Sequence, residues 1–124
     1  MAKILIVEDD KKIAAALAIR LKAEEFQVEI AVDAIMGIAC ARRFKPDLII
    51  LDISMPAGDG FTVAERLRSL TQTMLTPFIF LTASKQPGLR ERAMESGAAD
   101  FFEKPYEPNE LMAAIKNALA ETPA

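Results

Sequence analysis

The stretch Asp47-Leu48-Ile49-Ile50-Leu51-Asp52 decides the fold, because it is a nearly continuous apolar run that ends in a carboxylate. An apolar run of this length, without alternation, is typical of a strand that is buried on both faces, as in a parallel sheet. Lys45-Pro46 ends the segment before it, and a turn-rich stretch from Ser54 to Gly60 follows it. We therefore predict a central strand that ends at Asp52.

Short apolar runs alternate with longer segments of helical period on both sides of this strand. Further strands are predicted at Lys3 to Glu8, Gln27 to Ala31, Phe78 to Leu81 with Thr82 at its end, and Ala99 to Phe102. The first predicted helix runs from Lys11 to Ala23, and the second follows the N-cap Asp33 and carries Ile35, Ile38, Ala39 and Phe44. The third carries Phe61, Ala64, Leu67 and Leu70. A weaker helix at Leu89 to Glu95 is followed by Gly97, and the last helix runs from Pro108 to about Leu119.

Five strands that are each followed by a helix predict a doubly wound α/β fold. Parallel neighbours need crossover connections, and right-handed crossovers place helices on both faces of the sheet. No linker, repeat or low-complexity tract interrupts the pattern, so residues 1–124 are assigned to a single domain.

Composition excludes several classes of function. A net charge of -3 and a sequence pI near 5.0 leave no basic surface for direct binding to nucleic acid. No apolar run is long enough to span a membrane or form a signal-peptide core, so we expect a soluble, cytoplasmic protein. Histidine is absent, so any phosphohistidine in its reactions must come from a partner. The single Cys40 is expected to be a buried, unreactive thiol.

Polar residues gather where the predicted strands end, and in doubly wound sheets ligands bind beyond those ends. The first strand ends in Glu8-Asp9-Asp10, the third in Asp52, the fourth in Thr82 and the fifth in Lys104-Pro105. Each has an ordinary structural interpretation when it is taken alone, such as a helix cap for Asp10 or a solvated charge for Lys104. Together they indicate a functional site, because the residues within these strands are apolar.

The chemistry of this group points to phosphoryl transfer. Repulsion between Asp9, Asp10 and Asp52 is about 3 kcal/mol per pair at a separation of about 5 Å and an effective dielectric constant near 20. Mg²⁺ would neutralise them, since it prefers oxygen ligands and keeps waters for a substrate phosphate. With the Lys104 ammonium and the Thr82 hydroxyl on the other phosphoryl oxygens, Asp52 is predicted to be an in-line nucleophile that forms an acyl phosphate.

At these residues the chain resembles the receiver domain of two-component response regulators, from Lys3 to about Leu119. The motifs that carry the resemblance are Asp9-Asp10, Asp52-Ile53-Ser54-Met55-Pro56 with Gly60 behind it, Leu81-Thr82-Ala83, and Gly97-Ala98 leading to Lys104-Pro105. The resemblance implies a flavodoxin-like sheet with strand order 2-1-3-4-5. It implies that Asp52 is the phosphoacceptor, that Mg²⁺ is held by Asp9, Asp10, Asp52 and the backbone carbonyl of Ser54, and that the Lys104-Pro105 bond is cis.

The resemblance also implies a signalling switch that is no enzyme apart from self-phosphorylation and slow self-dephosphorylation. The phosphoryl donor would be a sensor histidine kinase or a histidine phosphotransfer protein, and the signal would pass to a downstream protein or an output domain. Thr82 would move toward the phosphoryl group, and Phe101, where many members have tyrosine, would turn inward beside the fourth strand. This would reshape the surface from about Leu89 to Leu119, where a partner or a second copy would bind and form a phosphorylation-dependent homodimer.

Two other functions share part of this chemistry. An aspartyl-nucleophile phosphohydrolase uses the same acceptor, but that class typically has a second aspartate two residues beyond the nucleophile, where this chain has Ser54. A binding module that has lost phosphorylation is the other alternative. It is disfavoured because the acids, Thr82 and Lys104 are all present.

Overall fold

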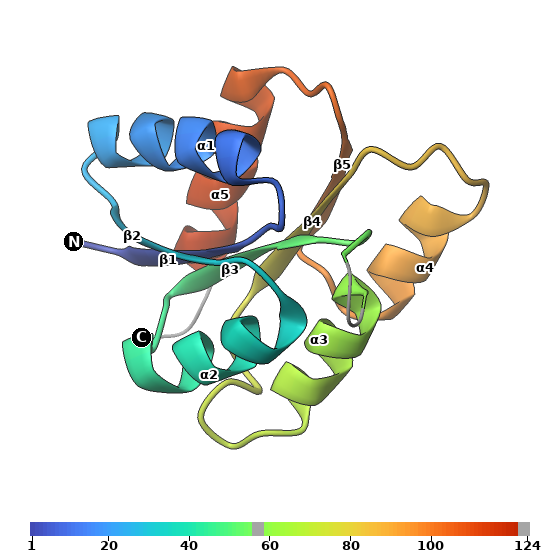
Figure 1. Ribbon diagram of the computed structural model, residues 1–124, viewed down its shortest axis with the longest axis horizontal. Helices are drawn as coiled ribbons and strands as arrows, with labels where there is room; N and C mark the ends of the chain where they lie inside the picture. The colour runs from blue at the N-terminus through green and yellow to red at the C-terminus, as the bar shows by residue number, and fades with distance from the viewer. Residues whose placement is uncertain (56–58, 122–124) are drawn as a thin grey trace.

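The computed structural model describes residues 1–55 and 59–121, and in these ranges five strands form one parallel sheet (Figure 1). The sheet has the order β2-β1-β3-β4-β5, which confirms the predicted doubly wound class and the order 2-1-3-4-5. The strands are β1 (Lys3–Val7), β2 (Gln27–Ala31), β3 (Leu48–Asp52), β4 (Phe78–Thr82) and β5 (Asp100–Glu103). As predicted, β3 is central, between β1 and β4.

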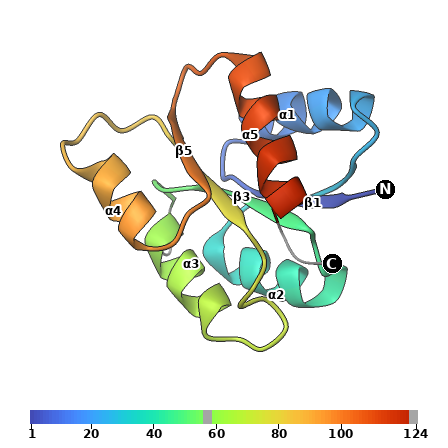
Figure 2. The ribbon, with the colours of Figure 1, turned by 180° about the vertical axis from the view of Figure 1, so that it is seen from behind.

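Helices cover both faces of the sheet, as Figures 1 and 2 show from opposite sides. On one face lie α1 (Lys11–Ala23) and α5 (Pro108–Glu121), and on the other lie α2 (Ala34–Phe44), α3 (Gly60–Arg68) and α4 (Leu89–Glu95). Successive side chains of a strand point to opposite faces. Ile50 therefore packs with α1 and α5, while Ile49 and Leu51 pack with α2 and α3, which explains why the whole of β3 is apolar up to Asp52.

Aspartates begin the first three helices. Asp10, Asp33 and Asp59 each accept a hydrogen bond from a backbone N–H in the first turn, so each satisfies amides that have no partner within the helix. The Asp33 cap confirms the sequence prediction, as does Pro108 at the start of α5. Gly97 follows α4 with φ of 96°, the left-handed conformation that its predicted place beyond the helix requires.

The side of α2 that faces the sheet is made mainly of small residues. Of the apolar residues that predicted this helix, Ile35 is 74% exposed, whereas Gly37, Cys40, Ala41 and Phe44 face the sheet. The reason is close packing on β1: a Cβ atom at Gly37 would lie 3.0 Å from Cγ1 of Val7. Small residues, rather than the isoleucine, bring α2 against the sheet, and Cys40 is buried as expected.

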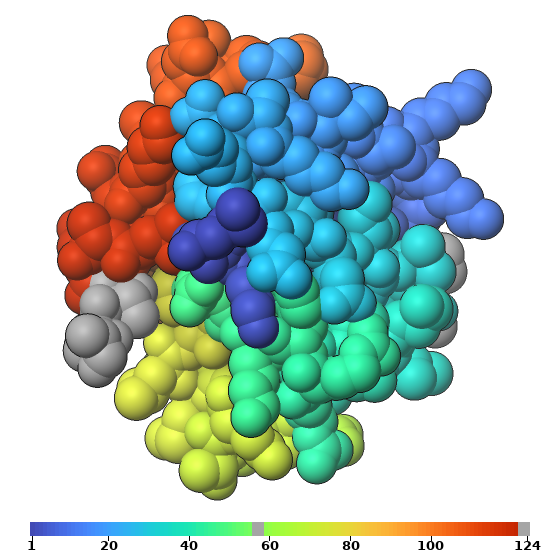
Figure 3. Space-filling model, turned by 90° about the vertical axis from the view of Figure 1, so that its left-hand side faces the viewer, coloured from blue at the N-terminus to red at the C-terminus, as the bar shows by residue number. Residues whose placement is uncertain are grey.

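The sheet edge formed by β2 lies on the side of the molecule that carries the N-terminus. Figure 3 views this side, where the blue surface of α1 and β2 lies above the green surface of α2, with the red surface of α5 at one margin. No helix in the described ranges combines the length and the apolarity needed to cross a membrane.

Candidate functional site

The carboxyl ends of the parallel strands bring the predicted site residues to one edge of the sheet. Asp52 and Thr82 are the last residues of β3 and β4, and Lys104 follows β5 directly. The backbone fixes their relative positions, because the Lys104 N–H donates to the Thr82 carbonyl at 2.7 Å and the Ile53 N–H donates to the Leu81 carbonyl at 3.0 Å. The strand ends are thus held in place by hydrogen bonds that continue the sheet.

Asp52 is a nearly buried carboxylate with a nearby ammonium group. Its side chain is 7% exposed, its Oδ1 accepts a hydrogen bond from the Ser54 N–H at 3.3 Å, and the same oxygen lies 3.9 Å from Nζ of Lys104. Burial, a hydrogen bond with Glu8 and the charge of Glu8 raise the pKa of Asp52 to about 7, while Lys104 and the Ser54 N–H oppose that rise. The surroundings of Asp52 therefore disfavour the negative charge of its ionised carboxylate.

Glu8 lies at the centre of the site, although the sequence analysis did not select it. Only 3% of Glu8 is exposed; its Oε1 pairs with Nζ of Lys104, and its Oε2 accepts a hydrogen bond from the Asp10 N–H at 3.2 Å. The side chains of β1 alternate between the two faces of the sheet, and this pattern in the sequence could have identified Glu8. It places Glu8 on the same face as Ile4 and Ile6. Asp52 follows Ile50 on that same face.

The acidic cluster therefore differs from the predicted one in one member. Ligand oxygens of Glu8, Asp9 and Asp52 all lie within 4.8 Å of one another, the only such group of three in the described residues. Asp10 was predicted to share this site, but its Oδ1 accepts hydrogen bonds from the N–H groups of Lys12 and Ile13, at 2.9 and 3.1 Å. The free amides at the start of α1 hold the Asp10 carboxylate as a helix cap.

Thr82 and Phe101 lie on the opposite face of the sheet. Thr82 is fully buried, and its Oγ1 accepts a hydrogen bond from the Ser84 N–H at 3.0 Å, which leaves the hydroxyl proton for donation to another group. Phe101 is 1% exposed and packs in the core that contains Phe80. Its ring is already inside, so the predicted inward turn would have to begin from a different conformation.

Gly60 places the start of α3 directly against Asp52. A Cβ atom at this position would lie 2.5 Å from the Asp52 carbonyl oxygen, and the Gly60 N–H donates to the Ile53 carbonyl at 2.9 Å. The Lys104-Pro105 bond is cis, as predicted. The predicted role of the Ser54 carbonyl stays a prediction, and Pro56 of the resemblance motif lies outside the described residues.

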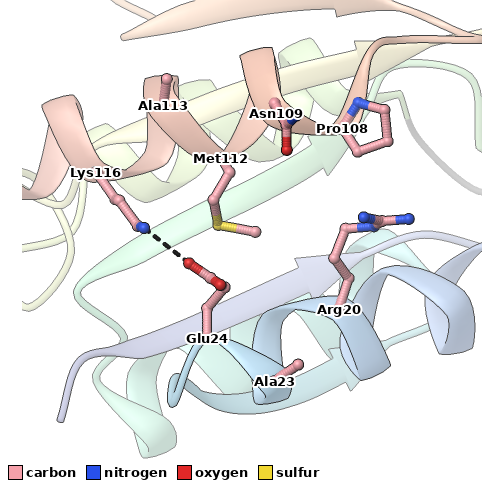
Figure 4. Close-up of a pocket in the computed structure, with 8 residues that line it drawn as sticks. All are labelled: Arg20, Ala23, Glu24, Pro108, Asn109, Met112, Ala113 and Lys116. Carbon is pink, nitrogen blue, oxygen red and sulfur yellow. Dashed lines mark hydrogen bonds and ion pairs between the residues drawn. The ribbon is translucent and has the colours of Figure 1, made fainter.

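Two pockets lie along the face formed by α1 and α5, and the first of them reaches Lys104. The first has a volume of about 340 Å³ and includes Lys104, Tyr106 and Leu17 in its lining. The second, about 430 Å³, is drawn in Figure 4, where the ion pair between Glu24 and Lys116, at 2.7 Å, joins the end of α1 to α5. Arg20 and Pro108 line both pockets, so they are adjacent along one surface.

Comparison with known proteins gives a consistent family. The profile described as "Response regulator receiver domain" matches residues 4–116. The DNA-binding dual master transcriptional regulator RpaA of Synechocystis is 39% identical over 122 residues, which cover 98% of this chain and 51% of RpaA. Response regulator PleD of Caulobacter vibrioides is 38% identical over 94% of this chain and 26% of PleD. The chain thus spans about half the length of these relatives, or less.

Solved receiver domains have the same fold over nearly their whole length. The non-phosphorylated receiver domain of HemR from Leptospira biflexa has a TM-score of 0.88 at 32% identity and covers 100% of this chain and 98% of its own. The BeF3-activated N-terminal receiver domain of RstA from Klebsiella pneumoniae has a TM-score of 0.88 at 30% identity, with coverage of 96% and 99%. With the profile match and these identities, the chain belongs to the response regulator receiver domain family of two-component signalling.

Proposed function

We propose that this receiver domain accepts a phosphoryl group on Asp52 from a phosphohistidine of a sensor histidine kinase or a histidine phosphotransfer protein. The observation that carries the proposal is the buried Asp52 carboxylate, which lies within one acidic cluster and 3.9 Å from the Lys104 ammonium. A donor histidine must come from outside, since the chain has none. Receiver domains are signalling modules, and phosphorylation here would serve as the signal.

The acidic cluster fits Mg²⁺. The oxygens of Glu8, Asp9 and Asp52 lie within 4.8 Å of one another, and carboxylate oxygens are the ligands that Mg²⁺ prefers. Glu8, Asp9 and Asp52 would hold the ion, with the Ser54 carbonyl as a further ligand. When bound, Mg²⁺ supplies positive charge that offsets the negative charge of the phosphoryl oxygens.

The residues of the chain supply the remaining steps of phosphoryl transfer. An Asp52 carboxylate oxygen attacks the donor phosphorus, the P–N bond breaks, and its electron pair returns to the donor imidazole. Lys104, whose ammonium is held close to Asp52 by Glu8, donates to one phosphoryl oxygen. The Thr82 hydroxyl donates to another, because its oxygen already accepts from Ser84 and its proton remains for donation. The product is a phosphoaspartate.

Phosphorylation would then change the surface that α4, β5 and α5 form. The target of that surface is a downstream protein, an output domain or a second copy of the chain in a phosphorylation-dependent homodimer. The whole length of residues 1–124 is proposed to be one receiver domain without direct contact to nucleic acid. Its place is proposed to be the cytoplasm, where such a switch would meet its kinase.

Intact-mass spectrometry with phosphoramidate, a small donor with a P–N bond, tests the proposal. With Mg²⁺ the wild-type chain should gain the mass of one phosphoryl group, and chelation of Mg²⁺ should prevent the gain. Asp52→Asn should stay unmodified, while Asp47→Asn, a matched change at the other end of the same apolar run, should react like the wild type. An unmodified wild type, or an Asp52→Asn variant that reacts normally, would overturn the assignment.

A further inference from the structure

Helix α4 is attached to the fold in an unusual way for this molecule. It has seven residues, Ala93 is its buried residue, and no side chain caps its N-terminus. Arginines make its polar contacts with neighbouring elements: Arg68 of α3 donates to the Ser96 carbonyl at 3.4 Å, and the guanidinium carbon of Arg92 lies 3.9 Å from the centre of the Phe61 ring. Leu89 and Ala93 pack against the core, and guanidinium groups add contacts at the periphery of α4.

Arg90 makes the corresponding contact with β5. Its Nη2 donates to the Phe101 carbonyl at 3.3 Å, and its guanidinium carbon lies 5.1 Å from the centre of the Phe101 ring. Arg90 is exposed and belongs to no ion pair among the described residues, whereas Phe101 is 1% exposed. The guanidinium therefore lies over the ring on its solvent side, and both of its contacts are made to Phe101.

The Phe101 ring, which Arg90 covers, lies beside β4 on the face of the sheet that also carries Thr82. Phe80 and Phe101 are direct neighbours in the pairing of β4 with β5 and belong to the same core. Thr82 follows Phe80 by two residues, so its side chain lies on the face that carries Phe101. A movement of the Thr82 hydroxyl would change the packing on this face, because packed interiors do not tolerate voids.

We propose that Arg90 is a positioning residue: it holds the Phe101 ring inside and so couples α4 to the occupancy of the acceptor site. The coupling rests on the proposed function of Asp52 and Thr82, whereas the contact that keeps the Phe101 ring inside does not. An outward turn of Phe101 must displace the guanidinium that covers it. A phosphoryl group would draw Thr82 away from the Phe101 ring and so favour the inward position of the ring. The contact with Arg90 favours that same position. Binding at the acceptor site and the Arg90 contact therefore strengthen each other.

Arg90→Met tests the hold on the ring, because methionine keeps an unbranched apolar stem and removes the guanidinium. In the full chain with labelled phenylalanine, NMR should show strong contacts from the Phe101 ring to core side chains in the wild type. These contacts should weaken in Arg90→Met and persist in Arg92→Met, which removes a similar contact from the same helix. A Phe101 ring that stays equally buried in Arg90→Met would overturn the proposal.

Titration with beryllofluoride in the presence of Mg²⁺ tests the coupling. The apparent affinity should fall about three- to tenfold in Arg90→Met, the range expected for losing one cation–π contact and its hydrogen bond. Mg²⁺ affinity without beryllofluoride should not change, and Arg92→Met should bind beryllofluoride like the wild type. Equal beryllofluoride affinity in Arg90→Met and wild type would overturn the coupling. A wild type that binds none would refute the proposed function instead, and the NMR result would still decide whether Arg90 holds the ring.

Discussion

At the scale of single residues, Asp52 makes the stability of the metal-free protein depend on pH. Its pKa is raised from 3.8 to about 7, so the folded protein binds a proton more tightly than the unfolded chain does. The stability that the protonated carboxyl contributes is complete below about pH 4 and is lost as the pH rises to about 7. The loss is on the order of 4 kcal/mol, since one pKa unit corresponds to about 1.4 kcal/mol.

Asp52→Asn should remove most of this dependence because the amide stays neutral. In the presence of a chelator at pH 8, the variant should have the larger free energy of unfolding, and at pH 4 the two proteins should be nearly equal. Urea unfolding at both pH values measures the difference. Glu65→Gln, a similar change at an exposed acid, should show no such pattern. An Asp52→Asn variant that is less stable than the wild type at pH 8 would contradict the electrostatic account of the site.

Glu8 and Asp10 are predicted to differ in their effect on Mg²⁺. Glu8→Gln removes a charge from the acidic cluster, so Mg²⁺ affinity should fall at least about tenfold, a loss of about 1.4 kcal/mol of binding free energy. Asp10→Asn should change the affinity much less, and it should leave α1 intact because asparagine is also a good N-cap. Isothermal titration calorimetry on both variants decides between the two residues. The larger loss in Asp10→Asn would restore the pair expected from the sequence.

At the scale of elements, the start of α3 and the end of β3 are predicted to depend on each other through Gly60. In Gly60→Ala the new Cβ would lie 2.5 Å from the Asp52 carbonyl oxygen, so the helix or the strand end must shift. We expect a loss of about 1–3 kcal/mol of stability, as for other overpacked sites, together with slower phosphorylation of Asp52. Gly88→Ala is the control, since nothing lies within 4 Å of its added Cβ and only its positive φ opposes the change. Chemical unfolding and intact-mass kinetics measure both effects, and an unaltered phosphorylation rate in Gly60→Ala would argue against the link.

The elements also show which parts of the structure the sequence could predict. The apolar run of β3 and the polar residues after the strands identify Asp52, Thr82 and Lys104 as neighbours, because parallel strands end at one edge of a sheet. Three consecutive acids after β1 leave the choice of metal ligands open, since Asp10 suits a helix cap and a metal site equally well. Hydrophobicity alone does not show that Ile35 faces solvent, because the approach of Gly37 to Val7 fixes how α2 faces the sheet.

At the scale of the whole molecule, Mg²⁺ is predicted to stabilise the fold, because its proposed ligands lie at the ends of β1 and β3 and are gathered only in the folded chain. At a concentration ten times its Kd, the ion should add about 1.4 kcal/mol to the free energy of unfolding. For a domain of this size the melting temperature should rise by about 3–6 °C. Calorimetry at constant ionic strength measures the shift, and Glu8→Gln at the same Mg²⁺ concentration should show little of it. A wild type that melts at the same temperature with and without Mg²⁺ would speak against a metal site in this cluster.

The ion pair between Glu8 and Lys104 joins residues that are 96 positions apart in the chain. A ribosome makes the N-terminal end first, so a nascent chain that extends only through β4 already contains Asp52 but still lacks Lys104. Such a chain holds Asp52 without the ammonium that lies beside it in the folded protein. Under the proposed function, truncated or unfinished products of translation would therefore not accept a phosphoryl group, and only chains that are synthesised and folded through β5 would do so.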